Sequence, residues 1–311
     1  MRIAAFDGGK PGIVASDDTV VEIGDVLAQY DPLGPENYIP DLITHYEELR
    51  PELERRAEQG GGTPLDQVQL DAPFARPGKI ICLMGNYREG TDRPKQRIDL
   101  FFKSPESLVG DRGTVMLPPH QADIFHHEAE IAVVIGKEAK SLSDDEAMDA
   151  VFGYVAFNDV SARGLGRSEI NSFLGKSFDT FGGFGPWIVT KDEIPDPQDL
   201  HITVDVDGER RQDYHTSDME RPIKELMTYI SSITTLHPGD VICCGTNHQG
   251  LGSMQDGDSV TTTVEGIGSF TLRVKDSAAR AWQRGVDKAT AERVKAQAVH
   301  PDVPEAGGSG S

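Results

Sequence analysis

The most informative segment of this 311-residue chain is Phe125-His-His-Glu-Ala-Glu-Ile-Ala-Val-Val-Ile-Gly-Lys137. Its second half is apolar and rich in β-branched residues, which predicts a buried strand. Glu128 and Glu130 stand at its entrance, and because side chains alternate across a strand, both carboxylates share a face with His126. Two like charges beside a core are costly unless a cation or strong donor compensates them. The alternative is a solvent-facing edge with two acids.

A second apolar run, Val151-Phe-Gly-Tyr-Val-Ala-Phe157, predicts a central strand that ends at Asn158 and Asp159. A carboxylate at the tip of a buried strand is a candidate functional group. Glu128, Glu130 and Asp159 would together offer three oxygen ligands from two strands, the set that a hard divalent cation requires. The sequence therefore predicts a magnesium or manganese site, with calcium the less favoured ion.

The charge of the chain limits its partners. A net charge of -21 argues against nucleic acid or an anionic membrane, which would be repelled. An acidic protein that binds an anionic substrate needs a local positive site, and Arg163 and Lys176 are the candidates. A metal beside these cations suits a chelating 2-oxo acid, because the metal polarises the ketone and stabilises an enolate while the cations hold the carboxylate.

Composition and segment boundaries complete the outline. No apolar run is long enough to span a bilayer and the N-terminus has no signal-peptide pattern, so we expect a cytoplasmic protein. The three cysteines fit no metal spacing. We expect a small N-terminal domain over residues 1–74, a main domain over 75–276, and a helical tail from about residue 278 with a linker-like end within 277–311.

Several motifs occur in an order that resembles the fumarylacetoacetate hydrolase family, over roughly residues 75 to 275. They are Pro77-Gly-Lys-Ile-Ile-Cys-Leu-Met-Gly-Asn-Tyr87, Glu128-x-Glu130, Phe152-Gly-Tyr154, Asn158-Asp-Val-Ser-Ala-Arg163, Gly175-Lys-Ser-Phe-Asp179, Gly185-Pro-Trp187, Pro238-Gly-Asp-Val-Ile242 and Gly245-Thr246. The resemblance implies a β-rich α+β fold: a mixed β-roll or β-sandwich catalytic domain with a small N-terminal α/β domain. It also implies a homodimer with a magnesium or manganese site.

The resemblance also implies roles for single residues. The family's metal ligands fall on Glu128, Glu130 and Asp159, and its site lysine on Lys176. Substrate-binding positions fall on Arg163, on Thr246, which matches a threonine near the substrate's carboxylate, and on Tyr87. Members of the family cleave C–C bonds of acylpyruvate-like diketo acids, or decarboxylate, hydrate or tautomerise 2-oxo acids.

The chain departs from the hydrolytic pattern at two places. The lid histidine and glutamate expected after Tyr87 are replaced by Gly90 and Arg93, so Glu89, Asp92 or His248 would have to carry the proton. The loop Gly245-Thr-Asn-His-Gln-Gly-Leu-Gly252 is one residue longer than usual, and this insertion supplies His248. A loop histidine bonded only to backbone is an equally good interpretation of His248.

The favoured function is a metal-dependent enzyme on a small anionic 2-oxo or 1,3-diketo acid, with C–C bond hydrolysis as the reaction. A hydratase, isomerase, tautomerase or decarboxylase acting through a metal-bound enolate is close behind, because these reactions need only the metal-stabilised enolate and one proton carrier. A further alternative is a non-catalytic dimeric β protein with a structural metal, which would leave Lys176 and Arg163 without a role.

Overall fold

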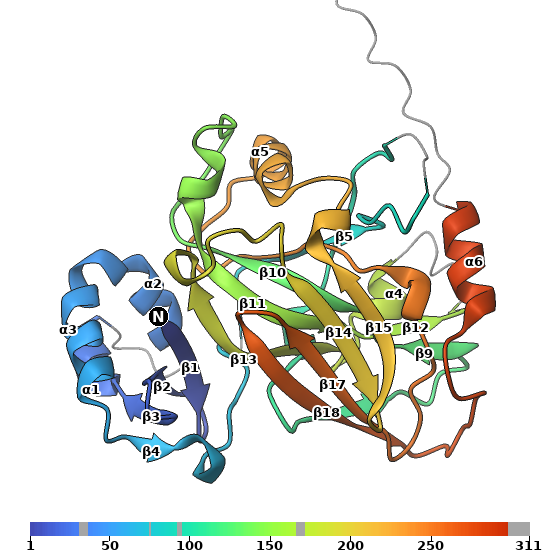
Figure 1. The fold of residues 1–311 in the computed structure, drawn as a ribbon, viewed down its shortest axis with the longest axis horizontal. Helices are drawn as coiled ribbons and strands as arrows, with labels where there is room; N and C mark the ends of the chain where they lie inside the picture. The colour runs from blue at the N-terminus through green and yellow to red at the C-terminus, as the bar shows by residue number, and fades with distance from the viewer. Residues whose placement is uncertain (31–36, 75, 92–94, 166–171, 298–311) are drawn as a thin grey trace, which may run out of the picture.

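The computed structural model describes residues 1–30, 37–74, 76–91, 95–165 and 172–297. It confirms a β-rich α+β fold built on two mixed sheets (Figure 1). The large sheet has the strand order β4-β3-β2-β1-β13-β11-β10-β16-β5-β6, with β7 paired to β13. Its strands are β1 (Arg2–Phe6), β2 (Lys10–Val14), β3 (Thr19–Glu22), β4 (Thr63–Pro64), β5 (Ile80–Met84), β6 (Asp99–Phe102), β7 (Leu108–Val109), β10 (Ala129–Ile135), β11 (Val151–Asp159), β13 (Gly182–Thr190) and β16 (Val241–Cys243).

The second sheet has the order β15-β14-β17-β18-β8 and packs on one face of β10 and β11 (Figure 1). Its strands are β8 (Thr114–Leu117), β14 (His201–Val206), β15 (Glu209–His215), β17 (Ser259–Val264) and β18 (Gly268–Asp276), and β9 (Ile124–His126) pairs separately with β12 (Ser161–Arg163). The helices are α1 (Gly24–Leu27), α2 (Tyr38–Thr44), α3 (Tyr46–Gln59), α4 (Ser172–Lys176), α5 (Ile223–Ile233) and α6 (Lys288–Gln297). Within the described residues, no helix is long and apolar enough to cross a membrane.

Strand β10 is buried along its whole length because its two faces belong to different cores. Ile131 and Val133 join the core shared with the second sheet and α5. Ala132 and Val134 join a core that also contains Leu49 of α3. A strand that is covered on both faces has a nearly continuous apolar sequence. This explains why the segment after Glu130 carries no polar residue.

The N-terminal segment adds its strands to the edge of the large sheet. Strand β1 pairs with β13, with Arg2 opposite Val189 and Ile3 opposite Ile188. Helices α1 to α3 cover the same part of the sheet at the left of Figure 1. Residues 1–74 therefore share a sheet and a core with the rest of the chain, and their treatment as a separate domain stays a prediction.

The C-terminal segment follows a different course from the helix expected after residue 277. Residues 277–287 run over the second sheet without regular structure, and the helix α6 begins only at Lys288. Gly285 has a φ of 99°, which a right-handed helix excludes. The side chains of Arg280 and Trp282 bond to backbone carbonyls of residues 118–123. Contacts with the body of the protein thus replace helical bonds in this segment.

Candidate functional site

Strand register brings the three predicted carboxylates together. Strands β10 and β11 are antiparallel, and Ala129 pairs with Asn158. Glu128 therefore lies opposite Asp159, whose N–H donates to the Glu128 carbonyl at 2.8 Å, and Glu130 lies two residues along the same face. All three residues are at least 97% buried, and one ligand oxygen of each lies within 4.8 Å of the others. We call Glu128, Glu130 and Asp159 the carboxylate triad.

Two predicted cations bind the triad. Lys176, at the end of α4, donates from Nζ to Oε2 of Glu128 at 2.5 Å and to Oδ2 of Asp159 at 2.6 Å. Arg163 of β12 donates from Nη2 to Oε1 of Glu128. Burial alone would raise the pKa of Glu128, but Lys176, Arg163 and, more weakly, His248 hold it well below its ordinary value. The pKa of Lys176 is raised against the effect of burial by Asp159 and Glu128.

Lys103 is a third cation at the triad, and sequence reasoning missed it. It follows β6, its side chain is fully buried, and its Nζ lies 2.7 Å from Oδ1 of Asp159. The same Nζ donates to the carbonyl of Lys176, so it also holds the end of α4 in place. The available signal was a lysine directly after the apolar pair Phe101 and Phe102, since lysine is rarely buried unless it is paired.

Glu130 differs from the other two carboxylates. Among the described residues it forms no salt bridge, and its Oε2 accepts a hydrogen bond from the N–H of Gly245 at 2.8 Å. Burial and the nearby carboxylate of Asp159 raise the pKa of Glu130 well above its ordinary value. A bound cation would relieve both effects. The all-carboxylate donor set, its burial and its spacing therefore fit a hard divalent cation.

Glu89 and His248 form a buried pair beside the triad. Oε1 of Glu89 lies 2.6 Å from Nδ1 of His248 and also accepts from the His248 backbone N–H at 2.9 Å. Gln249 donates to the other oxygen of Glu89 at 2.7 Å. Burial alone would raise the pKa of Glu89, but the hydrogen bond and charge of His248 outweigh it, so that this pKa is lowered. We call Glu89 and His248 the dyad.

Two loops with specific backbone conformations build the dyad. Glu89 has a φ of 56°, and its N–H donates to Oδ2 of Asp218 at 3.0 Å. His248 opens the short 3-10 helix His248–Gly250, where the Asn247 side chain accepts from the N–H of Gln249. The interpretation of His248 as bonded only to backbone is therefore wrong, because its ring meets a carboxylate. Gly90 is exposed beside the dyad, and Asp92 and Arg93 lie outside the described residues.

The remaining predicted residues are buried, and one of them, Thr246, follows Gly245, which donates to Glu130. Thr246 is buried, and its hydroxyl accepts from Nε2 of Gln212 at 2.8 Å. Gln212 also contacts Nδ1 of His127 through Oε1 at 3.0 Å, so its amide links Thr246 to His127. Tyr87 is completely buried and packs edge-on against Tyr214, with ring centroids 4.9 Å apart. Contact of Tyr87 or Thr246 with substrate stays a prediction.

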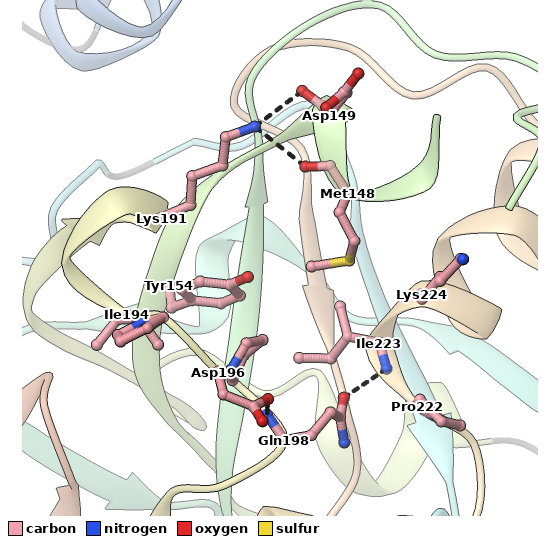
Figure 2. A pocket seen from close by; sticks show the side chains of 12 residues that line it. Met148, Asp149, Tyr154, Lys191, Ile194, Asp196, Gln198, Pro222, Ile223 and Lys224 are labelled. Atoms are coloured by element: carbon pink, nitrogen blue, oxygen red, sulfur yellow. Dashed lines mark hydrogen bonds between the residues drawn. The ribbon is translucent and has the colours of Figure 1, made fainter. Parts of the chain in front are cut away.

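A separate cavity of about 470 Å³ lies near the start of α5 (Figure 2). No residue of the triad or the dyad lines it. Tyr154 and Ile223 face its centre, and Lys191 donates from Nζ to the carbonyls of Met148 and Asp149. Two lysines and two aspartates line it in equal number, so its charge favours no ligand class. Its lining residues are Met148, Asp149, Tyr154, Lys191, Ile194, Pro195, Asp196, Pro197, Gln198, Pro222, Ile223 and Lys224.

Comparison with known proteins gives consistent matches. The family described as fumarylacetoacetate (FAA) hydrolase C-terminal matches residues 79–275. Maleylpyruvate hydrolase of Aquipseudomonas alcaligenes is 36% identical over 293 residues, covering 88% of this chain and 99% of its own. A mitochondrial oxaloacetate tautomerase of Bos taurus is 37% identical over 225 residues, covering 68% of this chain and 71% of its own.

Solved structures agree with these sequence matches. Maleylpyruvate hydrolase from Sphingobium sp. SYK-6, in complex with manganese(II) ion and pyruvate, superposes with a TM-score of 0.80 and 33% identity, covering 89% of this chain and 99% of its own. A 5-carboxymethyl-2-hydroxymuconate delta-isomerase from Mycobacterium smegmatis has a TM-score of 0.64 and 38% identity, covering 69% of this chain and 82% of its own. Hydrolysis and isomerisation thus both occur among close relatives of this fold.

Proposed function

Because the chain belongs to the fumarylacetoacetate hydrolase family, we propose that it is a magnesium- or manganese-dependent hydrolase that cleaves a C–C bond of an acylpyruvate-like acid. The buried Glu89–His248 pair beside the carboxylate triad carries this proposal. It supplies a proton carrier although the usual lid pair is replaced. Similarity to maleylpyruvate hydrolases over nearly the whole of those proteins supports the same reaction class.

The triad would hold the cation. When bound, a divalent cation supplies positive charge to the 2-oxo and carboxylate oxygens of the substrate. Arg163, which is about one-fifth exposed, would bind the substrate's carboxylate from the side of Glu128. Lys176 lies between Glu128 and Asp159 and would orient the oxo group.

The dyad would activate water. Nδ1 of His248 faces Glu89, which fixes the ring and leaves Nε2 to accept a proton. Water adds to the acyl carbonyl of the substrate as His248 takes its proton. The C–C bond to the pyruvate methylene then breaks, and the proton passes to that carbon. The products are a carboxylic acid and pyruvate, which together account for the substrate and one water.

A tautomerase or isomerase of a 2-oxo acid is the second candidate. Gly90 stands where hydrolytic members carry the lid histidine, and an oxaloacetate tautomerase is among the relatives. This reaction moves a proton between carbon and oxygen and needs no activated water. The same carboxylate triad would be sufficient for it, with Lys176 rather than the dyad as its proton carrier.

Conservative variants of the dyad distinguish these two reactions. We expect Glu89→Gln and His248→Gln to lower hydrolysis of maleylpyruvate by about 10²- to 10⁴-fold. Oxaloacetate tautomerisation should change less than about threefold with either variant. An ultraviolet assay in the presence of Mn²⁺ measures both reactions.

The control is Glu138→Gln, which breaks an exposed Glu–His pair with His237. It should leave both rates at the wild-type level. Equal loss of both reactions in Glu89→Gln, or loss of neither, would remove Glu89 from the proposed role. A wild type that turns over no 2-oxo acid, and whose Tm falls when the metal is removed, would favour the non-catalytic alternative with a structural metal.

We also propose that the protein is a homodimer. Strand β6 is an edge of the large sheet, and α4 packs against it. Phe102 and Phe173, from these two elements, are 60% and 59% exposed. Large apolar side chains exposed together favour an interface. Sedimentation of Phe102→Asp should show a monomer, whereas a wild-type monomer would contradict the proposal.

A further inference from the structure

Residues 276–297 form a strap that leaves the second sheet and reaches the site. All of these residues lie beyond the family match, which ends at residue 275. The strap begins where Asp276 binds Arg280. Trp282 packs on Phe125 of β9, with ring centroids 5.6 Å apart. Figure 1 shows the strap rising beside β9 and β12 and ending in α6. It therefore runs along the two strands that carry His126 and Arg163.

Asp287 is the residue of the strap that contacts the site. Its N–H donates to the carbonyl of Leu251 at 2.7 Å, which anchors it beside the loop of His248. Its Oδ1 accepts from the N–H of Thr290 at 3.0 Å, so Asp287 is the N-cap of α6. Its second oxygen, Oδ2, lies 3.3 Å from Nε2 of His126. One carboxylate thus caps a helix and holds a histidine.

His126 passes this contact on to Arg163. The His126 ring is completely buried, and its Nδ1 accepts from Nε of Arg163 at 3.4 Å. Because an arginine only donates, Nδ1 carries no proton, and Nε2 carries the proton that it donates to Asp287. The other end of the guanidinium donates to Glu128 of the triad. A continuous chain of polar contacts therefore runs from Asp287 to the triad.

We propose that Asp287 is a positioning residue that orients Arg163 through His126 for binding the substrate's carboxylate. This inference rests on the proposed function, in which Arg163 binds that carboxylate. A guanidinium held at Nε retains one orientation, and its free edge then meets a carboxylate with little loss of side-chain entropy. Without Asp287, the His126 ring loses the acceptor that fixes its tautomer, and Arg163 loses its fixed partner.

The substitution Asp287→Ser separates the two tasks of Asp287. Serine is a good N-cap, so it can still accept from Thr290, but its side chain is too short to reach His126. We expect the KM for maleylpyruvate and the Kd for pyruvate, measured by calorimetry with Mn²⁺ bound, to rise about tenfold. The kcat should stay within about twofold. Asp287→Ala removes both contacts. It should have the same KM as Asp287→Ser and a lower Tm than that variant.

Two further variants test whether the effect passes through His126. In the double variant His126→Gln/Asp287→Ser, the KM should equal that of His126→Gln alone, because coupled residues are not additive. Arg284→Ala removes the salt bridges that join the same strap to Asp207 and Asp258, and Arg284 itself does not contact the site. Its KM should be unchanged. A KM raised equally by Arg284→Ala and Asp287→Ser would make the strap merely structural and overturn the proposal.

A spectroscopic measurement keeps this test separate from the proposed function. In ¹⁵N-labelled protein, the His126 ring should show the Nε2–H tautomer, and Asp287→Ser should shift the signals of His126 and of Nε of Arg163. Unchanged signals overturn the positioning role even when the enzyme is active. If the wild type neither binds pyruvate nor turns over any 2-oxo acid, the proposed function fails, while the signals still decide whether Asp287 orients Arg163.

Discussion

The triad and the dyad lie side by side but are built in different ways. The triad stands on two neighbouring antiparallel strands, where the pairing of Ala129 with Asn158 fixes the positions of the carboxylates. The dyad joins Glu89 and His248, residues 159 apart in the sequence, through loops. The strand pair is fixed by its ladder of backbone bonds, whereas the loops depend on a few side-chain contacts. We therefore expect changes at the triad to have the larger effects on metal binding and stability.

The largest expected effect is that of Glu130→Gln. Glutamine keeps an oxygen for the N–H of Gly245 and nearly the same volume, but it removes a ligand charge from the triad. We expect Mn²⁺ affinity to fall at least about 100-fold, as estimated from the loss of a ligand, and turnover to fall with it. The Tm of the metal-free protein should stay at or above the wild-type value, as measured by calorimetry. Unchanged Mn²⁺ affinity would exclude Glu130 as a ligand.

Lys103→Met tests the charge balance of the triad. It leaves Asp159 buried with one cation fewer, and breaking a buried pair costs about 3 to 5 kcal/mol of the free energy of unfolding. Added Mn²⁺ should restore more stability to this variant than it adds to the wild type. The control is Lys79→Met, which removes the salt-bridge partner of the buried Asp240. This pair is not part of the triad or the dyad. Rescue of both variants by Mn²⁺ would contradict a specific effect at the triad.

Gly245→Ala tests the backbone that supports Glu130. Gly245 has a φ of 84°, and an added Cβ would lie 3.0 Å from Cβ of Asn86. The left-handed conformation alone costs about 1 to 2 kcal/mol. Gly257 has a φ of 87° with nothing near its Cβ position, so Gly257→Ala measures strain without a contact. Denaturant unfolding should show Gly245→Ala to be less stable than Gly257→Ala. Equal losses in the free energy of unfolding would show that the contact with Asn86 costs no stability.

The smallest expected effect is a pH dependence at the dyad. The pKa of Glu89 is lowered in the folded protein relative to its value of 4.5 in the unfolded chain. The ionised carboxylate thus adds stability above pH 4.5, and this stability is lost as the pH falls through the folded pKa. The free energy of unfolding of the wild type should exceed that of Glu89→Gln at pH 6, and the difference should shrink below pH 4.5. A difference independent of pH would contradict an ionised Glu89.

Sequence patterns alone predicted the β-rich fold and indicated which carboxylates come together. Alternation along a strand places Glu128 and Glu130 on one face, and the apolar run that ends at Asp159 predicts the neighbouring strand. These inferences succeed because strand periodicity is a local property. The helix expected from about residue 278 begins only at Lys288, because contacts of Trp282 with Asp123 and Phe125 replace helical bonds before it.

The groups around the triad are brought together by the packing of distant segments. Lys103 bonds to Asp159 of the triad, His248 pairs with Glu89, and Asp287 bonds to His126. These residues come from segments far apart in the chain, and their spacing in the sequence does not predict these contacts. Their positions depend on how loops close over the sheets and on the need of each buried charge for a partner. Periodicity carries information over a few residues, whereas charge pairing in a core is settled when distant segments pack.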